Sequence, residues 1–374
     1  MEKTKKYLII TMPVGKTKNI GDYIQVLAVR QFYDRIDGYI EKEELSHFHE
    51  ESGGGGVKAI ISGWFMWKPE NWPPSDDIDP LFISIHFSPL IIKDILSHKE
   101  YLEKHSPVGC RDFGTMKALR EEGINSYFSG CLTLTLGNTY HFEGNREGVY
   151  FVDPFFPIPL RNELSRLGIK NIIRILLCFA TNFNKINHLS RKRFFKYFAS
   201  SLGYESYESN LKGLSKSMFK ATCFYMTYRT KFSDKVLLSA EYIMHIIPVN
   251  KENPQSHDDW LNFADEYLKR YMKAKLVVTS RIHAALPSIA LETPVIFMNS
   301  KVLNSQKFEF NTPGRLEGIV DFFRTMTVND FEITTCDDTL KEFEVIDNNT
   351  IFRNKDNWRK YADSLSERCR KFLC

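Results

Sequence analysis

"LVVTSRIHAALPSIALETPVIF", residues 276–297, holds two short apolar runs and, between them, a segment that opens with Arg281 and His283. The runs predict strands at 276–279 and 294–298, because both have the length and the β-branched content of buried strands. Strand, connection and strand in this order make a β-α-β unit of a parallel sheet. Arg281 and His283 therefore stand where the first strand ends and the connecting helix begins.

The same alternation fills the first 130 residues of the chain. Apolar runs and amphipathic stretches follow one another, and Asn19 is placed to cap the first helix. The expected elements are strands at 7–14, 58–65, 80–87 and near 126–136, a helix behind Asn19, and a helix at about 113–122 that Gly123 ends. This order predicts an α/β fold whose parallel sheet has helices on both faces.

A second α/β unit begins near residue 148 with "GVYFVDPF" and resumes after an interruption. The strand at 294–298 is expected to be its last. The tail "DNWRKYADSLSERCRKFLC" has its apolar residues on one stripe and predicts a closing helix. We therefore divide the chain into an N-terminal domain at 1–147, a C-terminal domain at 148–350 and a closing helix within 351–374.

The interruption, at about 184–235, is strongly basic. It holds eleven Lys or Arg against three acidic residues, a net charge of +8 that exceeds the +4 of the whole chain. Eleven aromatic residues are interleaved with these charges. This pattern suits an anionic membrane surface, and it equally suits a helical insert with a buried aromatic face and a solvated basic face. Nucleic acid is disfavoured, because no recognisable nucleic-acid module accompanies the patch.

Other classes of protein are disfavoured by composition. No segment approaches the roughly 18 apolar residues of a membrane span, and the N-terminal apolar run is too short for a signal peptide, so we expect a cytoplasmic protein. The seven cysteines are scattered without a CxxC pair, which favours reduced, mostly buried thiols. No His, Asp or Glu spacing indicates a metal site.

Arg281 and His283 have side chains suited to a small anion. Ligands of parallel α/β sheets bind beyond the carboxyl ends of strands, where the next helix presents free N–H groups. A guanidinium grips a carboxylate or phosphate, and an imidazole is able to donate a proton near neutral pH. The alternative is that Arg281 makes a structural ion pair and His283 caps the helix.

Three other expected strand ends carry polar residues. His86 follows the run "FISI", Arg111 follows "SPVGC", and "KNIGD" places Asn19 and Asp22 at the start of the first helix. Each residue taken alone favours a structural role. Convergence of several of them at one edge of a sheet would indicate a site.

Three blocks of this sequence resemble the polysaccharide pyruvyl transferase family, in order and across most of the chain: "NIGDYIQVLAVRQF", "SPVGCRDFGTMKALREEGINSYFSGCLTLTL" and "LVVTSRIHAALPSIALETPVIF". The resemblance implies two Rossmann-like domains in a GT-B-like arrangement with the ligand cleft between them. It also implies a reaction in which the pyruvyl group of phosphoenolpyruvate becomes a cyclic ketal on two sugar hydroxyls.

The resemblance further implies a donor site at the Ser-Arg-x-His block. We expect Ser280 and Arg281 to bind the donor, with His283 as general acid. Arg111 and His86 are expected to complete the anion clamp from the other domain. No metal or cofactor is expected besides phosphoenolpyruvate as co-substrate, because arginines are able to neutralise the anion.

Asn19 and Asp22 are expected to orient the acceptor. In this family the acceptor is commonly a sugar of a cell-surface polysaccharide precursor, often lipid-linked on the cytoplasmic leaflet. The basic insert would then hold the enzyme at the inner face of the membrane. Two alternatives are a GT-B glycosyltransferase that uses a nucleotide sugar, and a non-catalytic scaffold of a polysaccharide-assembly complex.

Overall fold

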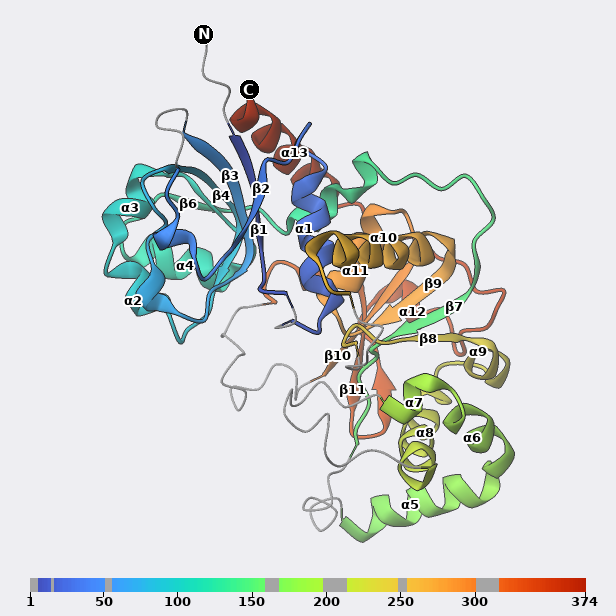
Figure 1. Ribbon diagram of the computed structural model, residues 1–374. Coiled ribbons are helices and arrows are strands. Elements are labelled where there is room, and N and C mark those ends of the chain that lie inside the picture. Colours follow the sequence, from blue (N-terminus) through green and yellow to red (C-terminus); the bar gives the residue numbers. More distant parts are fainter. Residues whose placement is uncertain are drawn as a thin grey trace.

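The computed structural model describes residues 6–14, 17–50, 56–158, 168–197, 214–247, 254–300 and 316–374. Two six-stranded sheets, both dominated by parallel pairing, form its two halves (Figure 1). The predicted α/β class is therefore confirmed.

The first sheet has the strand order β2-β1-β3-β4-β5-β6, with every neighbouring pair parallel. Its strands are β1 (Lys6–Thr11), β2 (Gly38–Glu41), β3 (Val57–Phe65), β4 (Ile78–Phe87), β5 (Val108–Cys110) and β6 (Ser126–Phe128). The helical elements of this half are α1 (Ile20–Arg30), η1 (Leu45–His47), η2 (Pro69–Asn71), α2 (Ile92–Leu96), α3 (Lys99–Lys104) and α4 (Phe113–Glu121). Strands β3 and β4 are buried along most of their length, as parallel strands covered on both faces must be.

The second sheet has the order β12-β11-β10-β9-β7-β8, and only the β11–β12 pair is antiparallel. Its strands are β7 (Glu147–Val152), β8 (Glu241–Ile243), β9 (Ala274–Thr279), β10 (Val295–Ser300), β11 (Arg324–Asn329) and β12 (Glu332–Thr334). Helices α10 (His257–Lys273) and α11 (Ile282–Ala290) flank β9 in the chain, and η6 (Val320–Phe322) and α12 (Asp338–Lys341) come later. The expectation that the strand after α11 is the last was wrong, because β11 and β12 extend the sheet beyond it.

A helical insert separates β7 from β8. It contains α5 (Gly168–Thr181), α6 (Phe183–Ser190), α7 (Arg193–Tyr197), α8 (Leu214–Tyr228) and α9 (Asp234–Ser239). Many of its aromatic side chains are buried: the rings of Phe224, Tyr228 and Phe232 pack edge-on against Phe151 of β7 at centroid distances of 5.3–5.4 Å. In the part of the insert that the structure describes, the interpretation of a buried aromatic face is therefore favoured; Phe198, Tyr204 and Tyr207 lie outside it.

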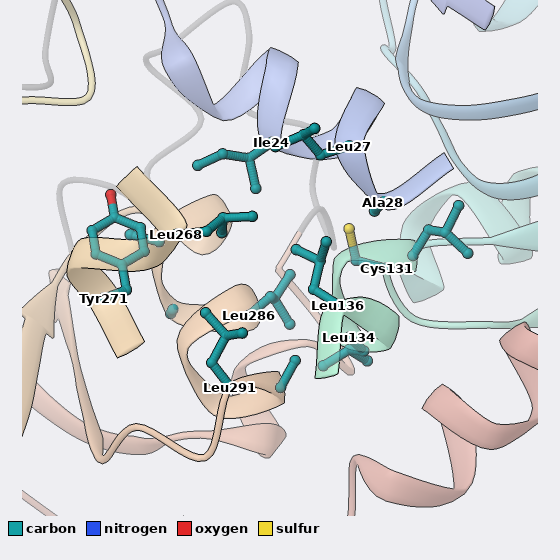
Figure 2. Packing of buried hydrophobic residues seen from close by; sticks show 14 of the residues in the cluster. Ile24, Leu27, Ala28, Cys131, Leu134, Leu136, Leu268, Tyr271, Leu286 and Leu291 are labelled. Carbon is teal, nitrogen blue, oxygen red and sulfur yellow. The ribbon is translucent and has the colours of Figure 1, made fainter. Parts of the chain in front are cut away.

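One hydrophobic core runs through both halves. Figure 2 shows Ile24 and Leu27 of α1 facing Leu136, Leu268 of α10 and Leu286 of α11. All five side chains are at least nine-tenths buried. Helix α1 of the first half thus packs on helices of the second half. The junction between the two halves is therefore part of the hydrophobic core.

The segment after β6 corrects one prediction. "CLTLTL" alternates like a strand, and a strand was expected near 126–136, but β6 ends at Phe128 and residues Leu132–Asn138 form the 3-10 helix η3. Gly130 turns the chain with φ +70°, a conformation that favours glycine. The threonines of the run are as buried as its leucines, so no solvent-facing side exists for an alternating strand.

The closing helix α13 (Arg359–Leu373) returns to the first half. Tyr7 of β1 donates from its hydroxyl to the carbonyl of Leu373 at 3.4 Å, and Asn138 Nδ2 donates to Ser366 Oγ at 2.8 Å. The predicted closing helix is therefore present. Within the described ranges, no helix has both the length and the apolar character to span a bilayer.

Candidate active site

The exit of β9 is held by side-chain bonds to the neighbouring strands. Thr279 Oγ1 donates to the carbonyl of Val152 at 2.6 Å. Ser280 Oγ donates to the carbonyl of Met298 at 2.7 Å and accepts from the backbone N–H of Phe155 at 2.8 Å. The ends of β7, β9 and β10 are thereby tied together. Ser280, which is expected to bind the donor, makes both of these bonds within the scaffold.

Arg281 makes an ion pair with a carboxylate at the neighbouring strand end. Its Nε donates to Asp153 Oδ2 at 3.1 Å; the Asp153 side chain is 3% exposed and that of Arg281 is 23% exposed. Burial raises the pKa of the Asp153 carboxyl, although Arg281 acts in the opposite direction. Asp153 also has a φ of +39°, unusual for a residue other than glycine. The Arg281 side chain is thus held at the sheet edge by Asp153 while part of its surface stays exposed.

His283 lies where the two halves meet. It is the second residue of α11 and is 9% exposed. A Cβ placed on Gly21 of α1 would lie 3.1 Å from His283 Cβ, 3.1 Å from Asn19 Oδ1 and 3.4 Å from His245 Nδ1. The beginnings of α1 and α11 are therefore in contact, and the absence of a side chain at Gly21 permits it.

A short antiparallel bridge between the halves supports this contact. The backbone N–H of Ile20 donates to the carbonyl of His245 at 2.9 Å, and that of Ile247 donates to the carbonyl of Lys18 at 2.8 Å. Asn19 caps α1 by accepting from the N–H of Gly21, as predicted. The structure thus brings Asn19 to the same junction as His283.

His245, which follows β8, is a fully buried neighbour of both Arg281 and Gly21. Its Nε2 lies 2.5 Å from the hydroxyl of Tyr271. Burial, with the positive charge of Arg281 as a second cause, lowers the pKa of His245 to about 3. This imidazole therefore stays neutral at physiological pH and serves as a hydrogen-bonding support.

Asp22 belongs to the same junction and lies close to a buried lysine. Thr17 Oγ1 donates to Asp22 Oδ2 at 2.5 Å, and Asn19 Nδ2 donates to Asp22 Oδ1 at 3.4 Å. Lys42, just after β2, donates from Nζ to the carbonyl of Trp64 at 3.1 Å. Burial lowers the pKa of Lys42 to about 8, with Asp22 the strongest opposing charge. The junction therefore has a buried lysine whose pKa lies near physiological pH.

His86 and Arg111 form a second group, on the first sheet at the ends of β4 and β5. His86 Nδ1 lies 2.7 Å from Asp112 Oδ2, and Arg111 Nε lies 3.8 Å from the same oxygen. All three side chains are fully buried. Burial alone would raise the pKa of Asp112, but His86 and Arg111 outweigh it, so the pKa is lowered and the carboxylate stays ionised.

The Arg111 guanidinium is the most unusual group of the site. It is fully buried, and none of its three nitrogens has a hydrogen-bond partner among the described residues. Buried polar groups are nearly always hydrogen-bonded, and a charged one left unsatisfied is costly. Apart from the ion pair with Asp112 at 3.8 Å, the described residues therefore leave this guanidinium unsatisfied.

Sequence reasoning missed three members of the site: Lys42, Asp153 and His245. Lys42 and Asp153 directly follow β2 and β7, and His245 lies two residues after the end of β8, as Arg281 does after β9. Applying the strand-end argument to every apolar run would have found them.

Two negative observations delimit the site. Among the described residues, no three His, Cys, Asp or Glu side chains gather as metal ligands would. A cavity of about 560 Å³ lies at the other end of α11, between Tyr140, Arg146, Leu291 and Trp358, and none of the predicted site residues lines it.

The model of one protein family, described as polysaccharide pyruvyl transferase, matches residues 19–301 of the chain. This span includes every predicted site residue, from Asn19 to His283. A comparison with curated proteins finds no match.

Proposed function

Because the chain belongs to the polysaccharide pyruvyl transferase family, we propose that it moves the pyruvyl group of phosphoenolpyruvate onto two hydroxyls of one sugar as a cyclic ketal. The family assigns a transferase of pyruvyl groups onto polysaccharide. The donor in this reaction is phosphoenolpyruvate. The reaction takes place in a GT-B-like cleft between the two halves. The acceptor is a lipid-linked precursor of a cell-surface polysaccharide, met at the inner face of the membrane.

The buried Arg111 guanidinium is the observation that carries the donor assignment. Phosphoenolpyruvate has a phosphate and a carboxylate, and a guanidinium binds either through paired N–H···O bonds. Arg111 offers such donors in a site already shielded from water, where the attraction is strongest. His86, held by Asp112, supports the same anion.

Arg281 serves the donor from the second sheet. Asp153 occupies its Nε edge and fixes the plane of the guanidinium, while the side chain keeps 23% of its surface exposed. A fixed guanidinium loses little freedom when the anion binds. We propose that Arg111 and Arg281 bind the two anionic ends of phosphoenolpyruvate, one from each sheet.

His283 is the general acid of the proposed reaction. It protonates the methylene carbon C3 of the donor, which makes C2 an oxocarbenium-like electrophile. One sugar hydroxyl adds to C2, the C2–O bond to phosphate breaks, and the second hydroxyl then adds to C2. Of the two hydroxyl protons released, one replaces the proton given by His283 and the other leaves with phosphate.

Asn19 and Asp22 orient the acceptor. Both stand at the start of α1, against the start of α11 that carries His283. A sugar hydroxyl bound there would lie beside the general acid. Because Asn19 and Asp22 are also bonded to each other, they offer a fixed pair of oxygens to the diol.

The test is release of phosphate from phosphoenolpyruvate in the presence of lipid-linked saccharides, followed by mass analysis of the saccharide for an added pyruvyl group. His283→Gln is expected to release phosphate 10²- to 10⁴-fold more slowly, in the range of lost general-acid catalysis. Binding of a nucleotide sugar without binding of phosphoenolpyruvate would instead identify a glycosyltransferase. Binding of saccharide with no turnover of either donor would identify a scaffold.

A further inference from the structure

Helix α5 exposes a continuous apolar stripe. Ile169, Ile173, Leu176 and Leu177 are 78%, 49%, 61% and 59% exposed. Their spacing of four, three and one residues puts them on one face of the helix. Just beyond the helix end, Phe183 is 47% exposed. The molecule thus presents large aliphatic side chains along several turns of one surface helix.

The opposite face of α5 is also apolar. Ile175 and Cys178 are each 7% exposed and belong to the core of the insert. A surface helix ordinarily has one apolar face turned to the core and one polar face turned to water, and a helix that is apolar on two faces is normally covered on both. The outer face of α5 therefore indicates an interaction surface.

The chain segment that carries this stripe and the helices after it has basic charges only, although Glu332 and Asp234 from other segments pair with two of them. Residues 169–197 include seven Lys or Arg and no Asp or Glu. Lys170 and Arg174 each stand three residues before a stripe residue, Ile173 and Leu177, and so border the stripe along one side. Arg174 is partly compensated by Glu332 of β12 at 3.3 Å, whereas the Lys170 side chain is exposed.

We propose that α5 docks on an anionic lipid surface, with its stripe in the acyl boundary and its basic residues among the headgroups. Amphipathic helices of this composition lie in the plane of the interface. A second copy of the chain is a poorer occupant, because a two-fold contact through α5 would set the same cations of both copies against each other. Figure 1 shows α5 at the periphery of the molecule, and Arg174 of this helix reaches Glu332 at the edge of the second sheet.

This surface is not the one that the sequence suggested. Among the described residues, most aromatic side chains of the basic segment at 184–235 pack inside the insert, with Tyr197 41% exposed, whereas the apolar stripe of α5 precedes that segment. Docking through α5 goes beyond the proposed transfer reaction and does not depend on its chemistry. Docking would bring the enzyme to the membrane surface that holds the proposed lipid-linked acceptor.

The experiment is flotation of the full chain with vesicles of phosphatidylcholine, with and without phosphatidylglycerol. We expect the wild type to float with the anionic vesicles and to be released by high salt. The triple variant Ile173→Gln, Leu176→Gln, Leu177→Gln should partition at least about tenfold more weakly, because it removes most of the apolar area that would enter the bilayer. Ile351→Gln, which alters an aliphatic side chain 76% exposed elsewhere, is the matched control and should float like the wild type.

Three outcomes would overturn the proposal: no flotation of the wild type, equal flotation of the triple variant, or a dimer in sedimentation that the triple variant abolishes without any flotation. Thermal unfolding checks that the triple variant folds, as exposed positions should allow. Phosphate release with a soluble saccharide separates the two proposals, because it should be unchanged in the triple variant. If the triple variant lost turnover but still floated, the result would contradict only the proposed transfer reaction.

Discussion

At the scale of single residues, Arg111 joins stability and function. A buried guanidinium without hydrogen bonds among the described residues destabilises the folded state. It lowers the free energy of unfolding, because each unsatisfied buried polar group costs about 1–3 kcal/mol and a charged one more. Apolar replacements of buried charges are often neutral or stabilising. Arg111→Met is therefore expected to keep or raise the midpoint of thermal unfolding.

The same substitution should weaken donor binding, with a KM for phosphoenolpyruvate at least about tenfold higher, because a charge-assisted pair is lost. Calorimetry of donor binding and a thermal melt of the same sample check both halves of this prediction. A lower melting point with unchanged donor affinity would show that Arg111 is only structural.

His245 makes stability depend on acid. Its pKa is about 3 in the folded protein against 6.5 ordinarily, so between these values the unfolded chain binds the extra proton. The stabilising contribution is therefore complete above pH 6.5 and falls by about 1.4 kcal/mol per pH unit as the pH decreases towards 3. The neighbouring Asp153, whose pKa is raised, contributes a slope of opposite sign.

Denaturant unfolding of the wild type and of His245→Gln across this window isolates the effect. Glutamine keeps a polar partner for the Tyr271 hydroxyl but takes up no proton. The difference in unfolding free energy between the two proteins should shrink as the pH falls. A difference that stays constant from pH 6.5 to 4 would refute the assignment.

At the scale of elements, the contact between α1 and α11 depends on one missing side chain. Gly21→Ala would add a Cβ 3.1 Å from both Asn19 Oδ1 and His283 Cβ. Alanine is about 1 kcal/mol better than glycine within a helix, which offsets part of the crowding. We therefore expect a small change in stability and a fall in turnover of about tenfold or more, since misplaced catalytic groups are costly.

Steady-state kinetics and a thermal melt check this prediction. Arg30→Ala, at the exposed other end of α1, is the control and should leave turnover unchanged. Full activity of Gly21→Ala would mean that the contact between α1 and α11 accommodates the added Cβ without displacing His283.

The elements also show what the sequence is able to predict. Helix α1 and its Asn19 cap follow local rules and were predicted, as were β3, β4 and α4. The 3-10 helix η3 was not, because burial at the junction overrode the alternating pattern of Leu132 to Leu136. The strand-end argument located Arg281 and, applied to β2 and β7, would also have located Lys42 and Asp153; the contacts of Lys42 with Trp64 and of Asp153 with Arg281 are distant in sequence, and no local pattern encodes them.

At the scale of the whole molecule, the shared core couples the two halves. Leu286 of α11 is fully buried in the cluster that also contains Ile24 of α1 and Leu136 of η3 (Figure 2). Leu286→Ala should lower the unfolding free energy by about 2–5 kcal/mol. Because both halves contribute to this cluster, hydrogen exchange should accelerate in β4 as well as in β10. Faster exchange in β10 alone would contradict a common unfolding unit.

The return of α13 to the first half has a consequence for how the protein is made. Residues of β1 and of α13 are in contact, so the first half is completed by residues synthesised 366 positions later. Domains generally fold as units, N-terminal first, while the chain is being made. Here the side of the N-terminal sheet that faces α13 stays uncovered until that helix has been synthesised, and a chain stopped before Arg359 would retain that exposed side.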